Sequence, residues 1–140
     1  MNVLSVSNLN LSILEHKILK DVSLKVRKGE IVGLAGESGS GKSMTALAVL
    51  NLLPSTSKKS GRILFKEQCI SHYSDAEMCS IRGDKISLIF QEPLTALNPL
   101  KTIKAQVAEP LLIHRKYTKS EAFELASETL NRVGIPIKLI

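Results

Sequence analysis

The chain contains one segment whose residue types and spacing could hold a phosphate group. It fits G-x-x-x-x-G-K-[ST] at every fixed position and consists of Gly36, Glu37, Ser38, Gly39, Ser40, Gly41, Lys42 and Ser43. In such a loop the glycines let backbone N–H groups turn toward a phosphate, the Lys42 ammonium reaches the β and γ oxygens, and the Ser43 hydroxyl can ligate a phosphate-bound Mg²⁺. The pattern therefore predicts a site for a nucleoside triphosphate with Mg²⁺.

Two flanking elements are needed to position this loop. The apolar run from Ile31 to Ala35 predicts a strand that ends at the loop, and residues 42–53 predict a helix that begins there. Because the N-terminus of a helix carries a partial positive charge, this helix would point that charge at the phosphate. A strand before the loop and a helix after it form the context in which this motif binds nucleotides.

The remaining periodicity predicts an antiparallel β region followed by mixed strands and helices. Alternating apolar residues over Val3–Leu11 and Val22–Val26 predict two strands joined by a polar turn. Capping boxes at Ser74 and Thr118 predict two helix starts. We also expect a loop over 54–61, a strand over 62–66, an end near Arg82 for the first capped helix, and a buried strand over 85–90. A helix is expected over 102–114, and Pro110 should kink or divide it. The last helix is expected to be amphipathic and to stop at Gly134 and Pro136, with one apolar face formed by Ala122, Leu125, Ala126, Leu130 and Val133.

The composition favours a single soluble globular domain. With 140 residues, 44% hydrophobic and 23% charged, the chain can bury a core and is not disordered. The net charge of +6 comes from scattered basic residues without a stripe of interleaved aromatics, which argues against nucleic-acid binding. Cys69 and Cys79 lack metal-site spacing, so we expect free thiols. No signal peptide or apolar run of about 20 residues occurs, so we expect a soluble chain that can dock on a membrane partner.

Other sequence features separate the families that use this loop. In small kinases the loop strand usually opens the chain, whereas here a predicted sheet comes first. A GTPase would need the patterns N-K-x-D and D-x-x-G, and the sequence contains neither. Neither class therefore fits the chain.

Three stretches together resemble the ATP-binding subunits of ABC transporters, in the branch that imports peptides, nickel or microcin-like peptides. They are residues 21–30, the loop itself, and residues 89–99, which read Ile-Phe-Gln-Glu-Pro-Leu-Thr-Ala-Leu-Asn-Pro. The resemblance implies an α/β P-loop NTPase fold with an N-terminal antiparallel β subdomain, and ATP and Mg²⁺ as ligands. It also implies transmembrane permease subunits and a second ATP-binding domain in a head-to-tail dimer as partners, and a location on the cytoplasmic face of the plasma membrane.

The resemblance assigns further roles to single residues. Gln91 matches the family's Q-loop glutamine, whose amide can ligate Mg²⁺ or the attacking water while its loop faces the membrane subunit. Ile13 matches the position of the aromatic residue that stacks on adenine and offers only apolar contact, since the first aromatic residue is Phe65. The expected division is an antiparallel β region over 1–30, a P-loop core over 31–91, and the Q-loop with the start of the helical subdomain over 92–140.

The chain departs from the family pattern in its catalytic elements. It contains no Leu-Ser-Gly-Gly-Gln signature, and its aspartates, Asp21, Asp75 and Asp84, neither precede a glutamate nor end an apolar strand. Hydrolysis needs the Walker B carboxylate to hold the metal and, in this family, the glutamate after it to polarise water. We therefore expect the N-terminal portion of an ATPase subunit that does not hydrolyse ATP by itself.

Three functions stay open on these residues. The first is the ATP-binding component of a peptide or related small-solute importer. The second is a non-catalytic fragment that binds nucleotide weakly or only pairs with a complementary chain, such as one that carries the missing half. The third is an ATPase of the same superfamily that acts on DNA or translation, against which residues 91–99 argue. The transported substrate is not encoded here, because permeases and binding proteins select it.

Overall fold

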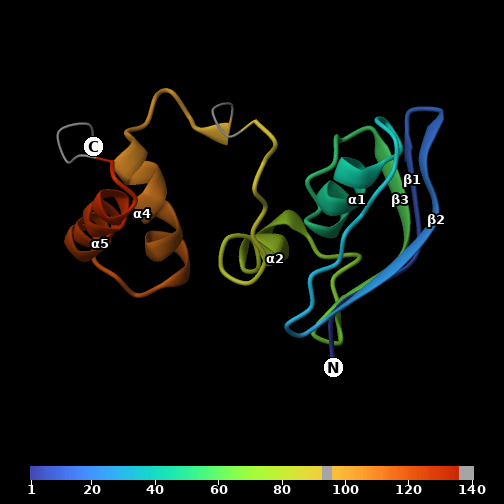
Figure 1. The fold of residues 1–140 in the computed structure, drawn as a ribbon, viewed down its shortest axis with the longest axis horizontal. Coiled ribbons are helices and arrows are strands. Elements are labelled where there is room, and N and C mark those ends of the chain that lie inside the picture. Colours follow the sequence, from blue (N-terminus) through green and yellow to red (C-terminus); the bar gives the residue numbers. More distant parts are fainter. Residues whose placement is uncertain (93–95, 136–140) are drawn as a thin grey trace. The chain divides into compact units, whose positions relative to one another are not determined.

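The computed structural model describes residues 1–92 and 96–135, which fall into two compact units. The first unit, Met1–Cys79, contains a sheet and two helices, and the second, Ser80–Ile140, contains a pair of helices (Figure 1). Pro93, Leu94 and Thr95, which belong to the expected Q-loop stretch, lie outside the described residues, as does Pro136.

The sheet of the first unit is antiparallel and has the strand order β2-β1-β3-β4. Its strands are β1 (Asn2–Ile13), β2 (His16–Arg27), β3 (Ser57–Phe65) and β4 (Gln68–Cys69). The two expected N-terminal strands are confirmed and are longer than the alternation indicated. The expected loop over 54–61 is wrong in its second half, because residues 57–61 pair with β1 and extend β3.

Matched irregularities in β1 and β2 bring their apolar residues to one face. Asn8 and Asp21 both have left-handed backbones with φ of 50°, and Asn8 Nδ2 donates a 2.6 Å hydrogen bond to Asp21 Oδ1. Strict alternation would place Val6 and Leu9 on opposite faces, since side chains repeat every second residue. The register shift between Val6 and Leu9 resets this alternation, and both side chains are buried.

One helix of the first unit packs on this sheet and follows the glycine-rich loop. Helix α1 (Lys42–Val49) buries Thr45, Ala48 and Val49. It is four residues shorter than the expected 42–53. Asn51 adopts a left-handed φ of 54°, and the residue before Pro54 is disfavoured in helical conformation. In Figure 1, α1 lies against β1, β2 and β3.

The short helix α2 (Asp75–Cys79) begins at the expected capping box. The Ser74 N–H donates to Glu77 Oε2 at 2.8 Å, and the Glu77 N–H donates to Ser74 Oγ at 3.3 Å. This reciprocal pair satisfies two N–H groups that the helix itself cannot. The helix ends before the expected Arg82.

Two expected strands are wrong. Residues 31–35 and 85–90 form no strand in the described part of the chain, where Ile86 makes only an isolated bridge to Arg82. Ile31 is 99% exposed and Ile89 is 92% exposed. A strand needs a neighbour for its ladder hydrogen bonds, and beyond the Ile86 bridge no described segment pairs with either run. Segment 31–35 is therefore uncovered, and segment 85–90 is only partly covered, with Ile86 and Leu88 half-buried.

The second unit contains helices α4 (Ile103–His114) and α5 (Lys119–Arg132). Thr102 caps α4, and Thr118 with Glu121 forms the expected capping box of α5. Pro110 does not divide α4, which is continuous. The buried alanines of the pair are Ala108, Ala122 and Ala126.

The last helix presents most of its expected apolar face to α4. Leu130 is buried as predicted, since it continues the spacing of Ala122 and Ala126. Val133 is exposed, and the prediction that it shares this face is wrong. It follows the end of α5 and no longer has the helical geometry that would direct it inward.

Candidate phosphate-binding site

The glycine-rich loop connects the exposed segment 31–35 to α1, and at two of its glycines an added Cβ would meet neighbouring atoms at short distance. Gly41 has a φ of 91° and is the N-cap of α1. A Cβ there would lie 2.5 Å from Leu19 Cδ2 and 3.3 Å from the Ile18 carbonyl oxygen. A Cβ on Gly36 would lie 2.7 Å from Ser40 Oγ. The loop therefore folds closely on itself and against β2.

Lys42 holds the loop together from inside. Its Nζ donates hydrogen bonds of 2.7 Å to the Gly36 carbonyl and 2.6 Å to the Glu37 carbonyl, and lies 3.4 Å from Ser40 Oγ. The ammonium thus lies at the centre of the loop with oxygen atoms around it. Hydrogen bonds from a cation to an anion are stronger than those to neutral carbonyls, so an entering phosphate would compete for this group.

The N-terminal end of α1 is anchored in the core. Thr45 is buried, its Oγ1 donates to the Gly41 carbonyl at 3.0 Å, and its N–H donates to the same oxygen at 2.8 Å. The first N–H groups of any helix have no partner within the helix. Here those groups follow Gly41 directly, and the loop residues Glu37 to Ser40 are exposed to solvent. An anion can therefore reach them.

The residues at the loop fit a Mg²⁺ ion that is carried in by the phosphates. They fit a permanently bound metal ion less well. Ser43 is exposed in the first turn of α1 and offers a hydroxyl oxygen, a type of ligand that Mg²⁺ accepts. Among residues 1–92 and 96–135, no cluster of three or more His, Cys, Asp or Glu could hold a metal ion. Mg²⁺ usually keeps several waters and takes few protein ligands alongside the phosphates.

The other expected site residues lie in different places. Ile13 is half-buried at the end of β1 and pairs with His16 and Ser57. Its alternation with Leu11, which pairs with Leu19, puts it on the sheet face against which the loop packs. Gln91 is exposed and belongs to the second unit, whereas the loop belongs to the first.

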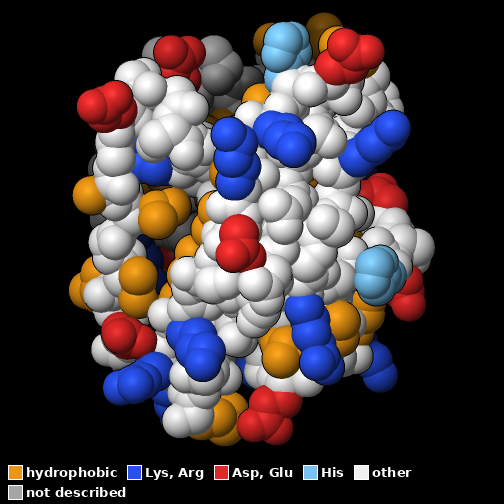
Figure 2. Space-filling view, turned by 90° about the vertical axis from the view of Figure 1, so that its right-hand side faces the viewer, with side chains coloured by type: hydrophobic (Ala, Val, Ile, Leu, Met, Phe, Trp, Pro, Cys, Tyr) orange, Lys and Arg blue, Asp and Glu red, His pale blue; other side chains and the backbone are white. Residues whose placement is uncertain are grey.

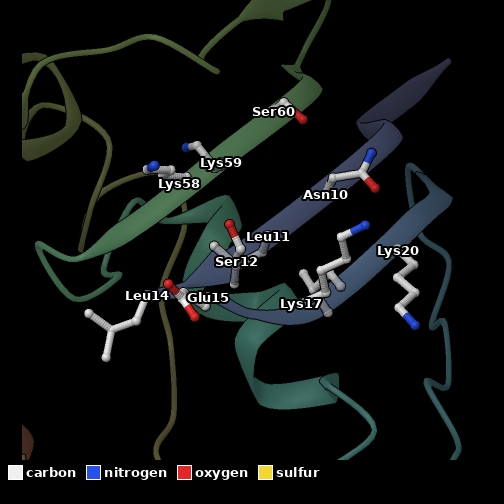
Figure 3. Close-up of a pocket in the computed structure, with 11 residues that line it drawn as sticks. Asn10, Leu11, Ser12, Leu14, Glu15, Lys17, Lys20, Lys58, Lys59 and Ser60 are labelled. Atoms are coloured by element: carbon white, nitrogen blue, oxygen red, sulfur yellow. The ribbon is translucent and has the colours of Figure 1, made fainter.

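A hollow of about 560 Å³ lies on the sheet near the turn between β1 and β2 (Figure 3). Its lining includes Ser12 and Leu14, on either side of Ile13, but not Ile13 itself among the described residues. Four lysines contribute to it, and Figure 3 shows their amines pointing in different directions. Because they do not converge, the hollow is not a second phosphate site.

The surface agrees with the expected scattering of basic residues. Figure 2 shows Lys and Arg side chains distributed over one face with acidic side chains between them, rather than in one continuous stripe. In the described ranges, no helix has both the length and the apolar character to cross a bilayer. Cys69 and Cys79 are free, as predicted.

Sequence reasoning missed the contacts that support the loop from behind. The packing of Gly41 on Leu19 and the proximity of Gly36 to Ser40 Oγ follow from the three-dimensional fold. The sequence held a partial signal for this packing. Leu19 is an apolar residue between Lys17 and Lys20, which indicates a side chain that points into the core.

A sequence pattern described as "ABC transporter" matches residues 19–139. The structure is also similar to the solved dimeric structure of the ATP-binding cassette MJ0796 in a post-hydrolysis state, bound to ADP and Pi. That similarity has a TM-score of 0.79 at 27% identity and covers 97% of this chain and 59% of the other.

Several curated relatives match the chain over most of its length. The dipeptide transport ATP-binding protein DppD of Bacillus subtilis (strain 168) is 45% identical, covering 96% of this chain and 42% of DppD. The oligopeptide transport ATP-binding protein AppD of the same organism is 43% identical, covering 81% of this chain and 35% of AppD. The glutathione import ATP-binding protein GsiA of Salmonella choleraesuis is 39% identical, covering 96% of this chain and 23% of GsiA. The chain therefore spans less than half the length of these relatives.

Proposed function

The chain belongs to the ABC transporter ATP-binding family, and we propose that it is the nucleotide-binding portion of a subunit that energises the import of peptides or related small solutes. The family is one of nucleotide-binding cassettes, and the relatives named above are ATP-binding components of dipeptide, oligopeptide and glutathione transport. The observation that carries the proposal is the closed loop Gly36–Ser43, with the Lys42 ammonium inside it and α1 directly after it.

In this proposal the Lys42 ammonium exchanges the carbonyls of Gly36 and Glu37 for the β and γ oxygens of ATP. The exchange is favourable because phosphate is an anion and the carbonyls are neutral. The N–H groups at the start of α1 and the glycine-rich turn contact the same phosphates. The helix dipole adds a favourable term of about 0.3–1 kcal/mol for a negative group at an exposed N-terminus.

Three further roles complete the proposed site. Ser43 ligates Mg²⁺, which when bound neutralises the charge on the β and γ phosphates. Gln91 contributes its amide oxygen to the same ion or to the attacking water, and Ile13 gives apolar contact to adenine. The half-buried position of Ile13 on the loop side of the sheet supports its role. We keep the division into a β region (1–30), a P-loop core (31–91) and a Q-loop with the start of a helical region (92–140).

An uncovered apolar segment supports the proposed partners. The segment 31–35 has an apolar character without a paired strand, and its Ile31 is 99% exposed. A strand carrying the Asp-Glu carboxylates, in a continuation of this chain or on a complementary one, would pair there and cover it. A second ATP-binding domain and permease subunits complete the assembly at the cytoplasmic face of the plasma membrane.

Phosphate release tests this function. The purified chain is expected to release no phosphate from Mg-ATP above background, because the sequence contains no Asp-Glu pair. Addition of a polypeptide carrying the Leu-Ser-Gly-Gly-Gln and Asp-Glu elements is expected to produce turnover, and Lys42→Ala controls for contaminating ATPases. Turnover by the chain alone that disappears in Lys42→Ala would contradict the proposed division of the catalytic site.

The second candidate is a non-catalytic nucleotide-binding or interaction fragment. The observation that favours it is the absence of the catalytic carboxylates from the sequence together with the uncovered segment 31–35. The same assay separates the two functions. A fragment that only binds would give no turnover with the complementary polypeptide, even though Mg-ATP still binds to the loop.

A further inference from the structure

Lys59 connects the first part of β3 to the C-terminal end of α1. Its Nζ donates a 3.1 Å hydrogen bond to Asn51 Oδ1 and lies 3.5 Å from the Ala48 carbonyl oxygen. On β3, Lys59 pairs with Leu11 of β1, and it shares a strand face with the buried residues Ile63 and Phe65. The side chain therefore crosses from the sheet to the helix within the first unit.

The position of this amine gives it more weight than an ordinary surface lysine. Lys59 is half-buried, and burial lowers the pKa of its ammonium from the usual value. Its partners are a backbone carbonyl of the last turn of α1 and a side chain just after that turn. A cation there complements the partial negative charge at the C-terminus of a helix.

Helix α1 is therefore held to the sheet at both ends. At its start, Gly41 packs against Leu19 and Ile18 of β2, and at its end, Lys59 reaches over from β3. Helix α1 has eight residues and is only about 12 Å long, so a tilt at one end also moves the other end. The loop Gly36–Ser43 joins α1 at the end opposite to Lys59.

We propose that Lys59 is a positioning residue for the phosphate loop, which sets the orientation of α1 and through it the N–H groups that receive phosphate. This inference rests on the proposed nucleotide-binding function. Lys59 does not touch the loop itself, because its contacts lie at the other end of α1. Lys58 is the matched control, since it is adjacent on β3, exposed, and on the opposite strand face, where it pairs with Ser12.

The test uses the full chain and the variants Lys59→Met, Lys59→Arg and Lys58→Met. Lys59→Met is expected to weaken Mg-ATP binding by up to about tenfold, the limit set by full coupling of one charge-assisted hydrogen bond to the loop. Lys59→Arg should recover part of the affinity because it restores a cation at the helix end, and Lys58→Met should bind like the wild type. A merely structural role would lower the unfolding midpoint of Lys59→Met but leave its affinity unchanged below that midpoint, and this result would overturn the inference.

A second readout does not depend on nucleotide. In the ligand-free chain, the amide resonances of Gly36, Gly39 and Gly41 are expected to shift in Lys59→Met and not in Lys58→Met. If wild-type chain fails to bind Mg-ATP, the proposed function fails, and these resonances still decide the role of Lys59. If Lys59→Met does not fold, Asn51→Gly replaces it, because glycine accepts the φ of 54° and removes one partner of the amine. Unshifted loop resonances in the folded variant overturn the inference.

Discussion

Replacing Gly41 by alanine should destabilise the first unit much more than the same change at Gly39, although both glycines belong to the loop. Both have left-handed backbones, with φ of 91° at Gly41 and 80° at Gly39. A Cβ on Gly41 would meet Leu19 Cδ2 at 2.5 Å and the Ile18 carbonyl oxygen at 3.3 Å, whereas a Cβ on Gly39 would meet nothing within 4 Å. The difference between the two variants therefore isolates the packing contact.

The magnitude follows from two costs. A left-handed backbone with a side chain costs about 1–2 kcal/mol, and this applies to both variants. Leu19 is only 3% exposed and cannot swing into solvent, so the added methyl at Gly41 also overpacks the core by about 1–3 kcal/mol. Gly41→Ala should thus lower the free energy of unfolding by about 2–5 kcal/mol, and Gly39→Ala by about 1–2 kcal/mol.

Urea unfolding monitored by circular dichroism measures both variants against the wild type. The slope of the transition should stay the same, so that the midpoints report stability. Equal losses in Gly41→Ala and Gly39→Ala would refute the packing of the loop on β2. Mg-ATP binding should weaken in Gly41→Ala at urea concentrations where the variant is still folded, because Gly41 is the N-cap of α1.

Three further predictions concern the base, the helix cap and the Q-loop. Ile13→Tyr should tighten Mg-ATP binding by up to about tenfold through stacking on adenine, and unchanged or weaker binding by calorimetry with the fold intact would exclude adenine from this position. The hydrogen bonds from the Thr118 hydroxyl and N–H lower the pKa of Glu121. The stabilisation of α5 by the Glu121 carboxylate is therefore present above the usual pKa of 4.5 and is lost as the pH falls through the lowered value. Amide exchange in α5 should show this acid dependence, and Glu121→Gln should abolish it. In the complemented assembly, Gln91→Ala should reduce phosphate release, and full turnover would remove Gln91 from the site.

The closed loop Gly36–Ser43 could be predicted because it depends on a few adjacent residues. The spacing of Gly36 to Ser43 is visible in the sequence, and in the structure the Lys42 ammonium donates to the carbonyls of Gly36 and Glu37. Its contact with phosphate stays a prediction. The two capping boxes were predictable for the same reason, since a hydroxyl and a carboxylate three residues apart satisfy each other locally. The alternation in β1 and β2 identified the strands without their irregularities at Asn8 and Asp21.

The failed strand predictions concern partners that are distant in the sequence. The apolar runs 31–35 and 85–90 predicted buried strands, but an apolar run shows only that a segment would be favourable to cover. In the described residues, 31–35 has no paired strand and is exposed, whereas 85–90 has only the bridge from Ile86 to Arg82 and leaves Ile89 and Phe90 exposed. Residues 57–61 contain polar residues and Gly61, and they became part of β3 because β1 supplies the hydrogen-bonding partner. The connection of Lys59 to α1 likewise depends on the fold and had no local signal.

The central claim is that Lys42 in the loop Gly36–Ser43 binds the phosphates of ATP. The most direct test is a titration of the chain with a fluorescent ATP analogue and Mg²⁺, using wild type, Lys42→Ala and Lys58→Ala. We expect saturable binding in the wild type and in Lys58→Ala, and at least about tenfold weaker binding in Lys42→Ala, because a charge-assisted contact to phosphate is lost. Equal affinity of Lys42→Ala and the wild type would contradict the account.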